Sequence, residues 1–235
     1  NVVETIHAMN DNKVRFFMAL GGNFLSAAPD TLLTEKGFEK CEVTVHISTK
    51  LNRSHLAPGK ISLILPCLGR TDKHFQGGKE DYNTRLKRDN GFELPNSARM
   101  GEFNTPTKKA IFTINSLPES LPPDHDYIMM TIRSHDQFNT TIYGLDDRYR
   151  GIFGCRHVVF MNREDMHSAQ LKKGELVELS NHYGQSRKIT GFSVVPYDIP
   201  KGCVATYFPE ANPLIPIDLY ARKSHTPASK SVGVN

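Results

Sequence analysis

Short apolar segments of strand length recur along the sequence, and most of them run directly into a polar loop. In the first 70 residues they are VRFFMAL (14–20), EVTVHIS (42–48) and KISLILP (60–66). The first is apolar almost throughout, as expected for a strand that a parallel sheet buries on both faces. A helical segment, TLLTEKG, lies between the first two strands, with Asp30 as its expected N-cap and Gly37 as its expected C-terminal stop. Strand, helix and strand joined by short links predict a partial parallel α/β domain over residues 1–70.

The sequence changes character after residue 70. Polar and charged residues dominate the next stretch, and we interpret residues 71–107 as an irregular connector. Beyond it the predicted strands are AIFTIN (110–115), YIMMTI (127–132), HVVFMN (157–162), ELVELSN (175–181), RKITGFSVV (187–195) and CVATYF (203–208). Six short strands with turns between them predict a six-stranded β-barrel or a sandwich over residues 108–235, with the Pro- and Ser-rich end wrapping its outside. The chain is therefore assigned to the α/β plus β class.

The composition is typical of a soluble globular protein. Charged residues make up 23% and hydrophobic residues 38% of the 235 residues. The 29 Lys and Arg exceed the 25 Asp and Glu by only +4, spread along the chain, which argues against a nucleic-acid partner. The apolar runs are too short for a membrane span, and Asn1 does not open a signal peptide. We therefore expect a cytoplasmic protein.

The cysteines and histidines do not predict a metal site. Cys41, Cys67, Cys155 and Cys203 lie far apart and form no CxxC pair, so neither a zinc ribbon nor an iron–sulfur cluster is indicated. We expect them to be buried, reduced thiols. The ten histidines show no metal-ligand spacing either.

Polar side chains follow the first two predicted strands. Gly21-Gly22-Asn23 follows the first, where glycines let a backbone approach a ligand and Asn23 offers both a donor and an acceptor. Thr49, Lys50 and Asn52 follow the second, a mixture that suits phosphate or the edge of a purine. Ligands of α/β sheets collect at such carboxyl ends. The alternatives stay open, because Gly-Gly-Asn is also an ordinary turn and the cations are also consistent with plain solvation.

The densest polar group is TIRSHDQFNTTIYGLDDRYRG, residues 131–151, directly after an apolar run. Arg133 emerges at the end of that run and needs an anion or a carbonyl as a partner. The amides and hydroxyls that follow suit a large heterocycle with many polar edges. His135 and Asp136 are adjacent and would point to opposite faces of an extended chain, so a catalytic dyad is the weaker interpretation. A long polar ligand that bridges both domains would account for these groups.

A short helix is expected among the strands of the second half. Asn162 can cap it, and Glu164 and Asp165 stand in its first turn, where the helix dipole favours negative charge.

Five blocks of the sequence, several of them long and specific, are LGGNFLSAAPDT, VTVHISTKLNRSHL, LILPCLGRT, TIRSHDQFNTTIYGLDDRYRGI and PEANPLIP. Together they resemble the C-terminal part of molybdopterin oxidoreductases, with the formate-dehydrogenase-like alpha subunits as the closest branch. The resemblance covers nearly the whole chain. It implies that the first part completes an α/β domain and that the second part is a double-psi β-barrel that closes over a cofactor.

By this resemblance the cofactor is molybdopterin guanine dinucleotide, held by loop residues at strand ends. The positions that match are Gly22, Asn23, Thr49, Lys50, Asn52, Arg133, His135, Gln137, Asn139, Thr140, Asn162, Asp165 and Asn212. Guanidinium and hydroxyl groups suit a diphosphate, and acidic or amide groups suit the donor edge of guanine. Asp165 keeps its alternative, which is only to complete a helix N-terminus.

Two departures from the family bear on activity. The family's N-terminal half, with its iron–sulfur cysteines and molybdenum ligand, has no counterpart in this sequence, and LPCLGRT and GFELPNSAR stand much closer together than in the family. We expect this chain to need that half as a partner, to serve an electron-transfer protein, and to be inactive alone. The rival interpretations are a stand-alone, non-enzymatic barrel that binds nucleotide or protein, and a small hydrolase or transferase that uses His135 and Asp136.

Overall fold

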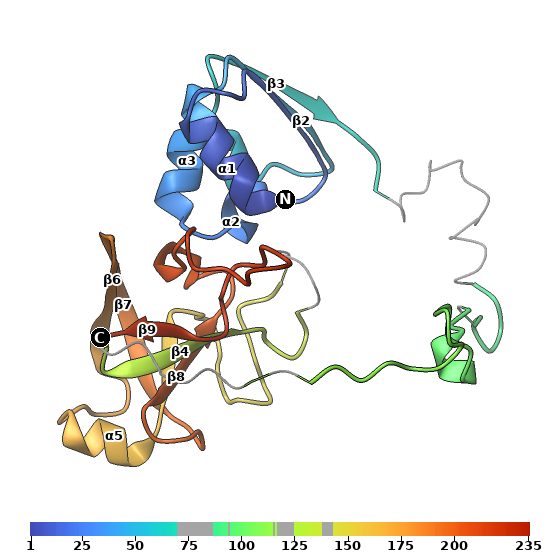
Figure 1. The fold of residues 1–235 in the computed structure, drawn as a ribbon. Helices are drawn as coiled ribbons and strands as arrows, with labels where there is room; N and C mark the ends of the chain where they lie inside the picture. Colours follow the sequence, from blue (N-terminus) through green and yellow to red (C-terminus); the bar gives the residue numbers. More distant parts are fainter. Residues whose placement is uncertain (70–86, 94, 115, 117–124, 138–142) are drawn as a thin grey trace. The chain divides into compact units, whose positions relative to one another are not determined.

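The computed structural model describes the chain except residues 70–86, 94, 115, 117–124 and 138–142 (Figure 1). It divides into two compact units, of which the first comprises Asn1–Pro66 with Ser120–Asn235 and the second Cys67–Glu119. The second unit contains one short 3-10 helix, η2 (Ala98–Met100), among its described residues.

The first unit has a helical and parallel-strand part followed by a β-rich part. Its elements up to residue 66 are α1 (Val2–Asn10), β1 (Phe16–Leu20), α2 (Phe24–Ala27), α3 (Thr31–Lys40), β2 (Val43–Ser48), η1 (Arg53–Leu56) and β3 (Ile61–Pro66). Its later elements are β4 (Tyr127–Ile132), β5 (Val158–Met161), α5 (Arg163–Ser168), β6 (Leu176–Tyr183), β7 (Gln185–Pro196), β8 (Cys203–Tyr207), η3 (Asn212–Leu214) and β9 (Val232–Val234).

The early strands form a parallel sheet in the order β1-β2-β3, which confirms the predicted α/β layer. One face packs on the helices: the ring of Phe17 lies 5.2 Å from that of Phe24 in α2 and 5.1 Å from that of Phe38 in α3. The expectation that both faces of the first strand are buried is wrong for the described chain. Phe16 and Met18 are each 57% exposed, because their side chains point away from the helices.

Helix α3 begins where the sequence predicted but not for the predicted reason. Asp30 stands at the N-cap position without capping through its side chain, and its φ of 46° is left-handed. Its carboxylate instead pairs with Arg187 in β7. Gly37 does not end the helix, which runs on to Lys40. A Cβ added at Gly37 would lie 3.1 Å from Cβ of Met9, so this glycine lets α1 pack closely on α3.

The later strands form a six-stranded mixed sheet in the order β6-β7-β5-β8-β4-β9. Pairs β4–β8 and β5–β7 are parallel, whereas β4–β9, β5–β8 and β6–β7 are antiparallel. The two edges approach each other, since Ser180 of β6 exchanges both backbone hydrogen bonds with Asn235, directly after β9. The sheet is therefore a nearly closed barrel around an apolar core that includes Met129, Phe192 and Val194. This confirms the α/β plus β class and the barrel, while the double-psi connectivity stays an expectation.

Two strand predictions fail in the second half. Residues 110–114 of the predicted strand AIFTIN are not in a strand, and residue 115 lies outside the described residues. Phe112 is 95% exposed there, because the segment belongs to the second unit and has no partner strand among the described residues. Conversely, the C-terminal stretch expected to wrap the outside contributes the buried strand β9.

The four cysteines are free thiols, but only Cys41 is buried, and Cys155 is exposed. The expectation of four buried thiols is therefore wrong. Within the described residues, no group of three His, Cys, Asp or Glu side chains is placed to hold a metal ion. No described helix has the length and apolar character needed to cross a membrane.

Candidate functional site

The carboxyl ends of β1 and β2 meet in a small polar cluster. Asn52 caps η1 and donates from Nδ2 to the Gly22 carbonyl, 2.9 Å away. Asn23 caps α2, and its Oδ1 also accepts from the Ser54 hydroxyl at 3.1 Å. The structure therefore brings Gly22, Asn23 and Asn52 together, as a parallel sheet requires. Their hydrogen bonds hold the two loops to each other.

The cations of these loops face solvent. Thr49 and Lys50 are exposed, with no side-chain partner among the described residues. Arg53, which follows Asn52 and begins η1, is also exposed and lines a cavity described below. These groups remain available to a ligand, and plain solvation remains open for Thr49 and Lys50.

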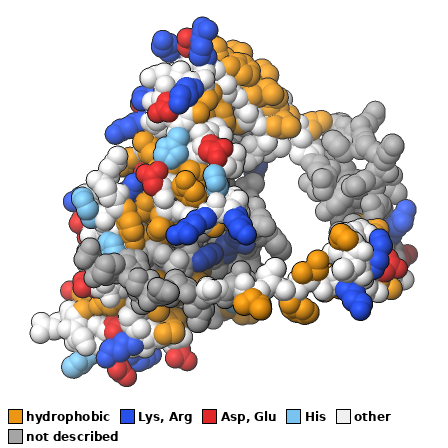
Figure 2. All heavy atoms as spheres, viewed as in Figure 1, with side chains coloured by type: hydrophobic (Ala, Val, Ile, Leu, Met, Phe, Trp, Pro, Cys, Tyr) orange, Lys and Arg blue, Asp and Glu red, His pale blue; other side chains and the backbone are white. Residues whose placement is uncertain are grey.

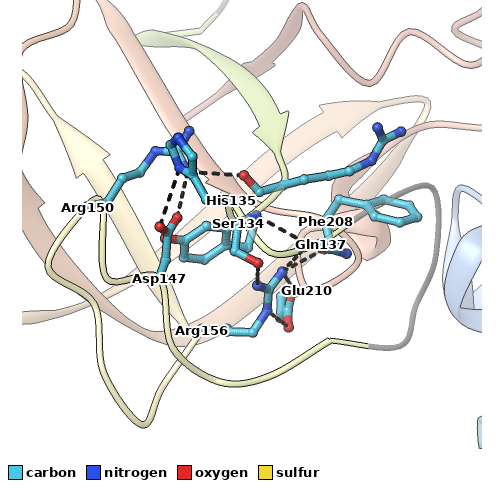
Figure 3. Close-up of polar contacts among 10 residues, drawn as sticks. Ser134, His135, Gln137, Asp147, Arg150, Arg156, Phe208 and Glu210 are labelled. Atoms are coloured by element: carbon cyan, nitrogen blue, oxygen red, sulfur yellow. Dashed lines mark hydrogen bonds and ion pairs between the residues drawn. The ribbon is translucent and has the colours of Figure 1, made fainter. Parts of the chain in front are cut away.

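In the barrel, the loop after β4 is fixed from beneath by a buried guanidinium (Figure 3). Arg156 donates from Nη1 to the Ser134 hydroxyl at 2.9 Å and from Nη2 to Oε1 of Gln137 at 2.8 Å. It also forms an ion pair with Glu210, with 2.8 Å between Nε and Oε1. The Arg156 guanidinium lies between two aromatic rings, 3.9 Å from the centre of Tyr143 and 4.4 Å from that of Tyr207. The loop after β4 is therefore positioned by Arg156, which lies 22 positions after Ser134 and 19 after Gln137 in the sequence.

The side chain of Gln137 is part of the hydrogen-bond network around Arg156. It is 5% exposed, and its Nε2 donates to the Phe208 carbonyl at 2.9 Å while its Oε1 accepts from Arg156. The structure places it beneath the loop surface, where it anchors the loop to the end of β8.

The side chain of Arg133 takes no part in the hydrogen bonds of Arg156 given above. It is exposed, its carbonyl accepts from Arg150, and its guanidinium has no hydrogen-bond or ion-pair partner among the described residues. Burial and the nearby Arg133 charge both lower the pKa of Lys230, so two cations share this region. Two neighbouring cations favour an anionic ligand.

A second buried group supports the loop from the side. Tyr207 donates to Oδ2 of Asp147 at 2.9 Å, and Arg150 pairs with the same oxygen at 2.5 Å. Burial raises the pKa of the Asp147 carboxyl, but hydrogen bonds from Arg150 and Tyr207 outweigh it and the pKa is lowered. Oδ1 of Asp147 is buried and has no hydrogen-bond partner among the described residues; Nδ1 of His135 lies 3.7 Å from it.

His135 and Asp136 do not form a dyad. His135 stacks on Tyr149, with 4.2 Å between ring centres, and faces Asp147 rather than its neighbour. Asp136 is exposed and lies 3.8 Å from Arg148. The predicted site residues Asn139 and Thr140 lie outside the described residues.

A cavity of about 180 Å³ joins the two parts of the first unit. Its walls are Ser26, Thr31, Arg53, Tyr143, His157, Pro209, Glu210 and Pro213. Burial, followed by the charge of Glu210, raises the pKa of the Tyr143 hydroxyl to about 12, so this wall presents a neutral phenol beside a carboxylate. A guanidinium, three hydroxyls and a carboxylate around one cavity suit a ligand with both phosphate oxygens and N–H groups.

Asn212 connects the barrel part to the α/β part of the first unit through its side-chain amide. It is 3% exposed and donates from Nδ2 to the carbonyls of Ser26 at 2.8 Å and Ala28 at 3.2 Å. It thereby ties η3 of the barrel part to the end of α2. The buried pair of Asp30 and Arg187, with 2.6 Å between Oδ2 and Nη2, adds a second connection.

Asn162 and Asp165 lie at the other rim of the barrel. Strand β5 is antiparallel to β8, which is parallel to β4, so the carboxyl end of β5 lies at the same end of the barrel as the amino end of β4. Asn162 caps α5, and Asp165, 5% exposed, accepts from the Gly202 backbone N–H at 2.7 Å. The structure does not bring these two residues together with Arg133. A more open hollow of about 440 Å³ lies over Asn162, Arg163 and Tyr197, but no buried charge lines it among the described residues.

Arg156, Glu210, Asp147 and Tyr143 were not predicted from the sequence. Arg156 and Glu210 are 54 positions apart, and only the fold brings them together. Arg53 is one of the two cations of the second polar loop, but it was not among the predicted site residues. The signal that could have found Arg156 is an arginine immediately before the strand run HVVFM, where burial would demand an acidic partner.

Comparison with known proteins identifies a matching domain family and several longer relatives. Residues 127–233 match the family described as "Molydopterin dinucleotide binding domain". An uncharacterized oxidoreductase of Mycobacterium tuberculosis is 36% identical over 310 residues, covering 99% of this chain and 40% of that protein. Protein YdeP of Escherichia coli is 30% identical over 309 residues, covering 99% of this chain and 41% of that protein.

The chain thus spans less than half the length of these relatives. Because the first alignment runs over 310 positions and the chain has 235 residues, roughly 75 positions of the relative face no residue here.

Proposed function

We propose that this chain, whose residues 127–233 belong to the Molydopterin dinucleotide binding domain family, is the C-terminal cofactor-binding portion of a molybdenum oxidoreductase and holds molybdopterin guanine dinucleotide. The observation that carries the proposal is the shared cavity. Arg53 from the α/β layer faces Tyr143 and Glu210 from the barrel across it. A dinucleotide is a ligand long enough to need polar groups from both parts.

The residues present fit the cofactor in kind. The guanidinium of Arg53 and the hydroxyls of Ser26 and Thr31 suit diphosphate oxygens, and Arg133 offers a second exposed guanidinium directly after β4. Glu210 offers the carboxylate that the N–H edge of guanine prefers. A cavity of about 180 Å³ holds only one part of such a ligand. The rest must lie along the exposed loops, where Lys50 and Arg133 stand.

The chain's own task is to bind and orient the nucleotide tail. Molybdenum, when bound on the pterin, supplies the two-electron chemistry. In this proposal Arg156 holds the loop of residues 133–137 in place, while Asn52 and Asn23 hold the strand-end loops, so that the ligand meets preformed walls.

The substrate and the partners are the finer part of the proposal. Formate is the leading substrate by analogy with the branch that the sequence blocks resemble, and the missing half of the enzyme and an electron-transfer protein are the partners. The location proposed is cytoplasmic. Family analogy alone does not fix a substrate, since substrate residues lie in the site around the metal.

Titration of the purified chain with GDP tests the binding claim. Saturable binding is expected, weakened about tenfold or more in Arg53→Ala and in Arg133→Ala, because a charge-assisted hydrogen bond contributes about 1.5–3 kcal/mol. Arg163→Ala is the matched control, because Arg163 is also exposed but begins α5 and does not line the 180 Å³ cavity. Absence of binding, or equal loss in the control, would contradict the proposal. Formate-driven dye reduction by the chain alone would contradict the expectation that it is inactive by itself.

A further inference from the structure

Two neighbouring histidine rings connect the core of the α/β layer to the loop after β2 (residues 49–54). His46 of β2 is 1% exposed, and its ring stacks on that of Phe38 in α3, with 6.0 Å between ring centres. The ring of His55 in η1 lies 4.8 Å from it. Figure 2 shows histidine side chains, in pale blue, at the surface of the molecule, whereas His46 is hidden. His46 thus takes a place in the core that apolar side chains normally occupy.

Each of the two rings has a nitrogen without a hydrogen-bond partner. Nε2 of His46 and Nε2 of His55 are buried, and neither has a partner among the described residues. Buried polar groups are normally hydrogen-bonded, because an unpaired one loses its contacts with water without replacement. A protonated ring would lose more, since it is charged and both of its N–H groups need acceptors. The site therefore favours two neutral rings.

The groups that face His46 do not offset a positive charge on it. Within the sheet it is flanked in register by Ala19 of β1 and Ile64 of β3, and on the helix side by Phe38. The titratable group that faces it is His55 of η1. Burial lowers the pKa of His46, and the charge that His55 carries when protonated lowers it further. Both effects keep His46 neutral.

His55 joins the pair to the loop after β2 through its other nitrogen. Nδ1 of His55 accepts from the backbone N–H of Asn52 at 2.9 Å, and Oδ1 of Asn52 accepts from the N–H of Ser54 at 3.0 Å. These bonds belong to the capping box of η1. Only an unprotonated Nδ1 can accept. A hydrogen on Nδ1 could point to the carbonyl oxygen of Asn52, 3.0 Å away, but the Asn52 N–H would lose its acceptor.

We propose that His46 and His55 are positioning residues: as a neutral pair they hold the loop after β2 in place, and protonation of the pair releases it. The loop carries Arg53, which lines the cavity of about 180 Å³, so its release would withdraw a guanidinium from that cavity. The consequence for ligand binding rests on the proposed function. The release of the loop does not.

The release should set in as the pH falls below about 6.5, the ordinary pKa of a histidine. In the open loop the rings meet water and titrate near this value, whereas the pKa of His46 in the closed loop is lower. The open state therefore binds protons that the closed state does not, and acid favours it. For one histidine that titrates only in the open state, the open population rises about tenfold between pH 7.5 and pH 5.5.

Amide hydrogen exchange of the chain without nucleotide tests the inference. The protection factor of the Asn52 N–H, which is corrected for the intrinsic exchange rate at each pH, should fall about tenfold from pH 7.5 to pH 5.5. Backbone amides of β5 in the barrel are the internal reference. They should keep their protection, because the release is local.

Two substitutions test the two histidines separately. In His55→Asn the side-chain oxygen can replace Nδ1 as an acceptor but does not titrate, so the Asn52 amide should stay protected at both pH values. His46→Phe removes the buried nitrogen and its charge, and the Asn52 amide should then be better protected at pH 5.5 than in the unsubstituted chain. His167→Asn is the matched control, because His167 is exposed on α5 and its substitution should leave the tenfold fall in place.

GDP titration at the same two pH values connects the pair to the proposed site. The affinity should fall by a larger factor in the unsubstituted chain than in His55→Asn, since both share any effect of protonating the nucleotide itself. An equal fall in both would overturn the link to ligand binding. Absence of GDP binding at either pH would reject the proposed function and leave the exchange result standing.

Three exchange results would overturn the inference. The protection of the Asn52 amide could stay constant with pH, it could fall equally in His55→Asn, or the amides of β5 could lose protection by the same factor, which would indicate global unfolding. The first and third results are read from the unsubstituted chain, so they do not require either variant to fold.

Discussion

The guanidinium of Arg156 and the carboxylate of Glu210 form a 2.8 Å ion pair in which the two side chains are 2% and 11% exposed. The hydrogen bonds of Arg156 join two separate loops: Ser134 and Gln137 follow β4, whereas Phe208 and Glu210 follow β8. The pair therefore acts as a clamp between two parallel strands at the rim that lines the cavity.

Replacing Arg156 by Met should lower the free energy of unfolding by about 3–5 kcal/mol, because it leaves the Glu210 carboxylate buried without its partner. Urea unfolding monitored by circular dichroism measures the loss. Arg148→Met is the control, since Arg148 is 65% exposed and lies 3.8 Å from Asp136; its effect should stay within about 0.5 kcal/mol. If both substitutions lowered the free energy of unfolding equally, the pair of Arg156 and Glu210 would not hold the two loops together.

The free energy of unfolding should decrease in acid, because the Asp147 carboxylate becomes protonated there. Its folded pKa is lowered below the ordinary value, because the hydrogen bonds from Arg150 and Tyr207 outweigh burial. A lowered carboxyl pKa contributes stability above the unfolded pKa of about 3.9, and that contribution is lost as pH falls through the folded pKa. Urea midpoints measured from pH 7 to pH 2.5 should therefore drop below about pH 4. Asp147→Asn should flatten this acid limb, and Asp136→Asn, at an exposed position, should not. An unchanged limb in Asp147→Asn would refute the assignment.

The pair of Asp30 and Arg187 should couple the α/β layer to the barrel. Both side chains are under 9% exposed and lie in segments 157 positions apart. Arg187→Ala should cost about 3–5 kcal/mol, and hydrogen exchange should increase in both α3 and β7. Lys188→Ala, on the neighbouring and 67% exposed position, is the control. Faster exchange in β7 alone would mean that the pair does not couple the two parts.

Gly59 should not tolerate a side chain. A Cβ there would lie 2.6 Å from the backbone carbonyl oxygen of Cys41, which cannot move without shifting the start of β2. Gly59→Ala is expected to destabilise by about 1–3 kcal/mol. A Cβ at Gly144 meets nothing within 4 Å, so Gly144→Ala should be neutral or slightly stabilising. Thermal unfolding of the two variants checks the difference, and equal melting temperatures would contradict it.

The sequence predicted local structure where an apolar run was long and bounded. YIMMTI became β4 at its predicted bounds, and β2 and β3 moved by one residue. Prediction failed where the outcome depends on a distant partner. Residues 110–114 have the pattern of a strand, but no strand lies beside them in the described part of the chain. The three residues of β9, by contrast, are too short to show a pattern and gain their place from β4.

The same limit applies to the site. Gly22, Asn23 and Asn52 could be grouped from the sequence, because strand ends of a parallel sheet share an edge. Asn162 and Asp165 could not be assigned to one end of the barrel from the sequence. The direction of β5 depends on its antiparallel pairing with β8, which the residues of β5 alone do not predict. The contact between Arg156 and Glu210 depends on the pairing of whole strands.

The placement of α5 has a practical consequence. The helix stands at the rim away from Arg133, and its His167 side is exposed. A single attachment point at that position would orient the molecule on a support with the loop after β4, which carries Arg133, facing outward. Immobilised preparations could then be compared by surface plasmon resonance or on an electrode without steric interference at the loops.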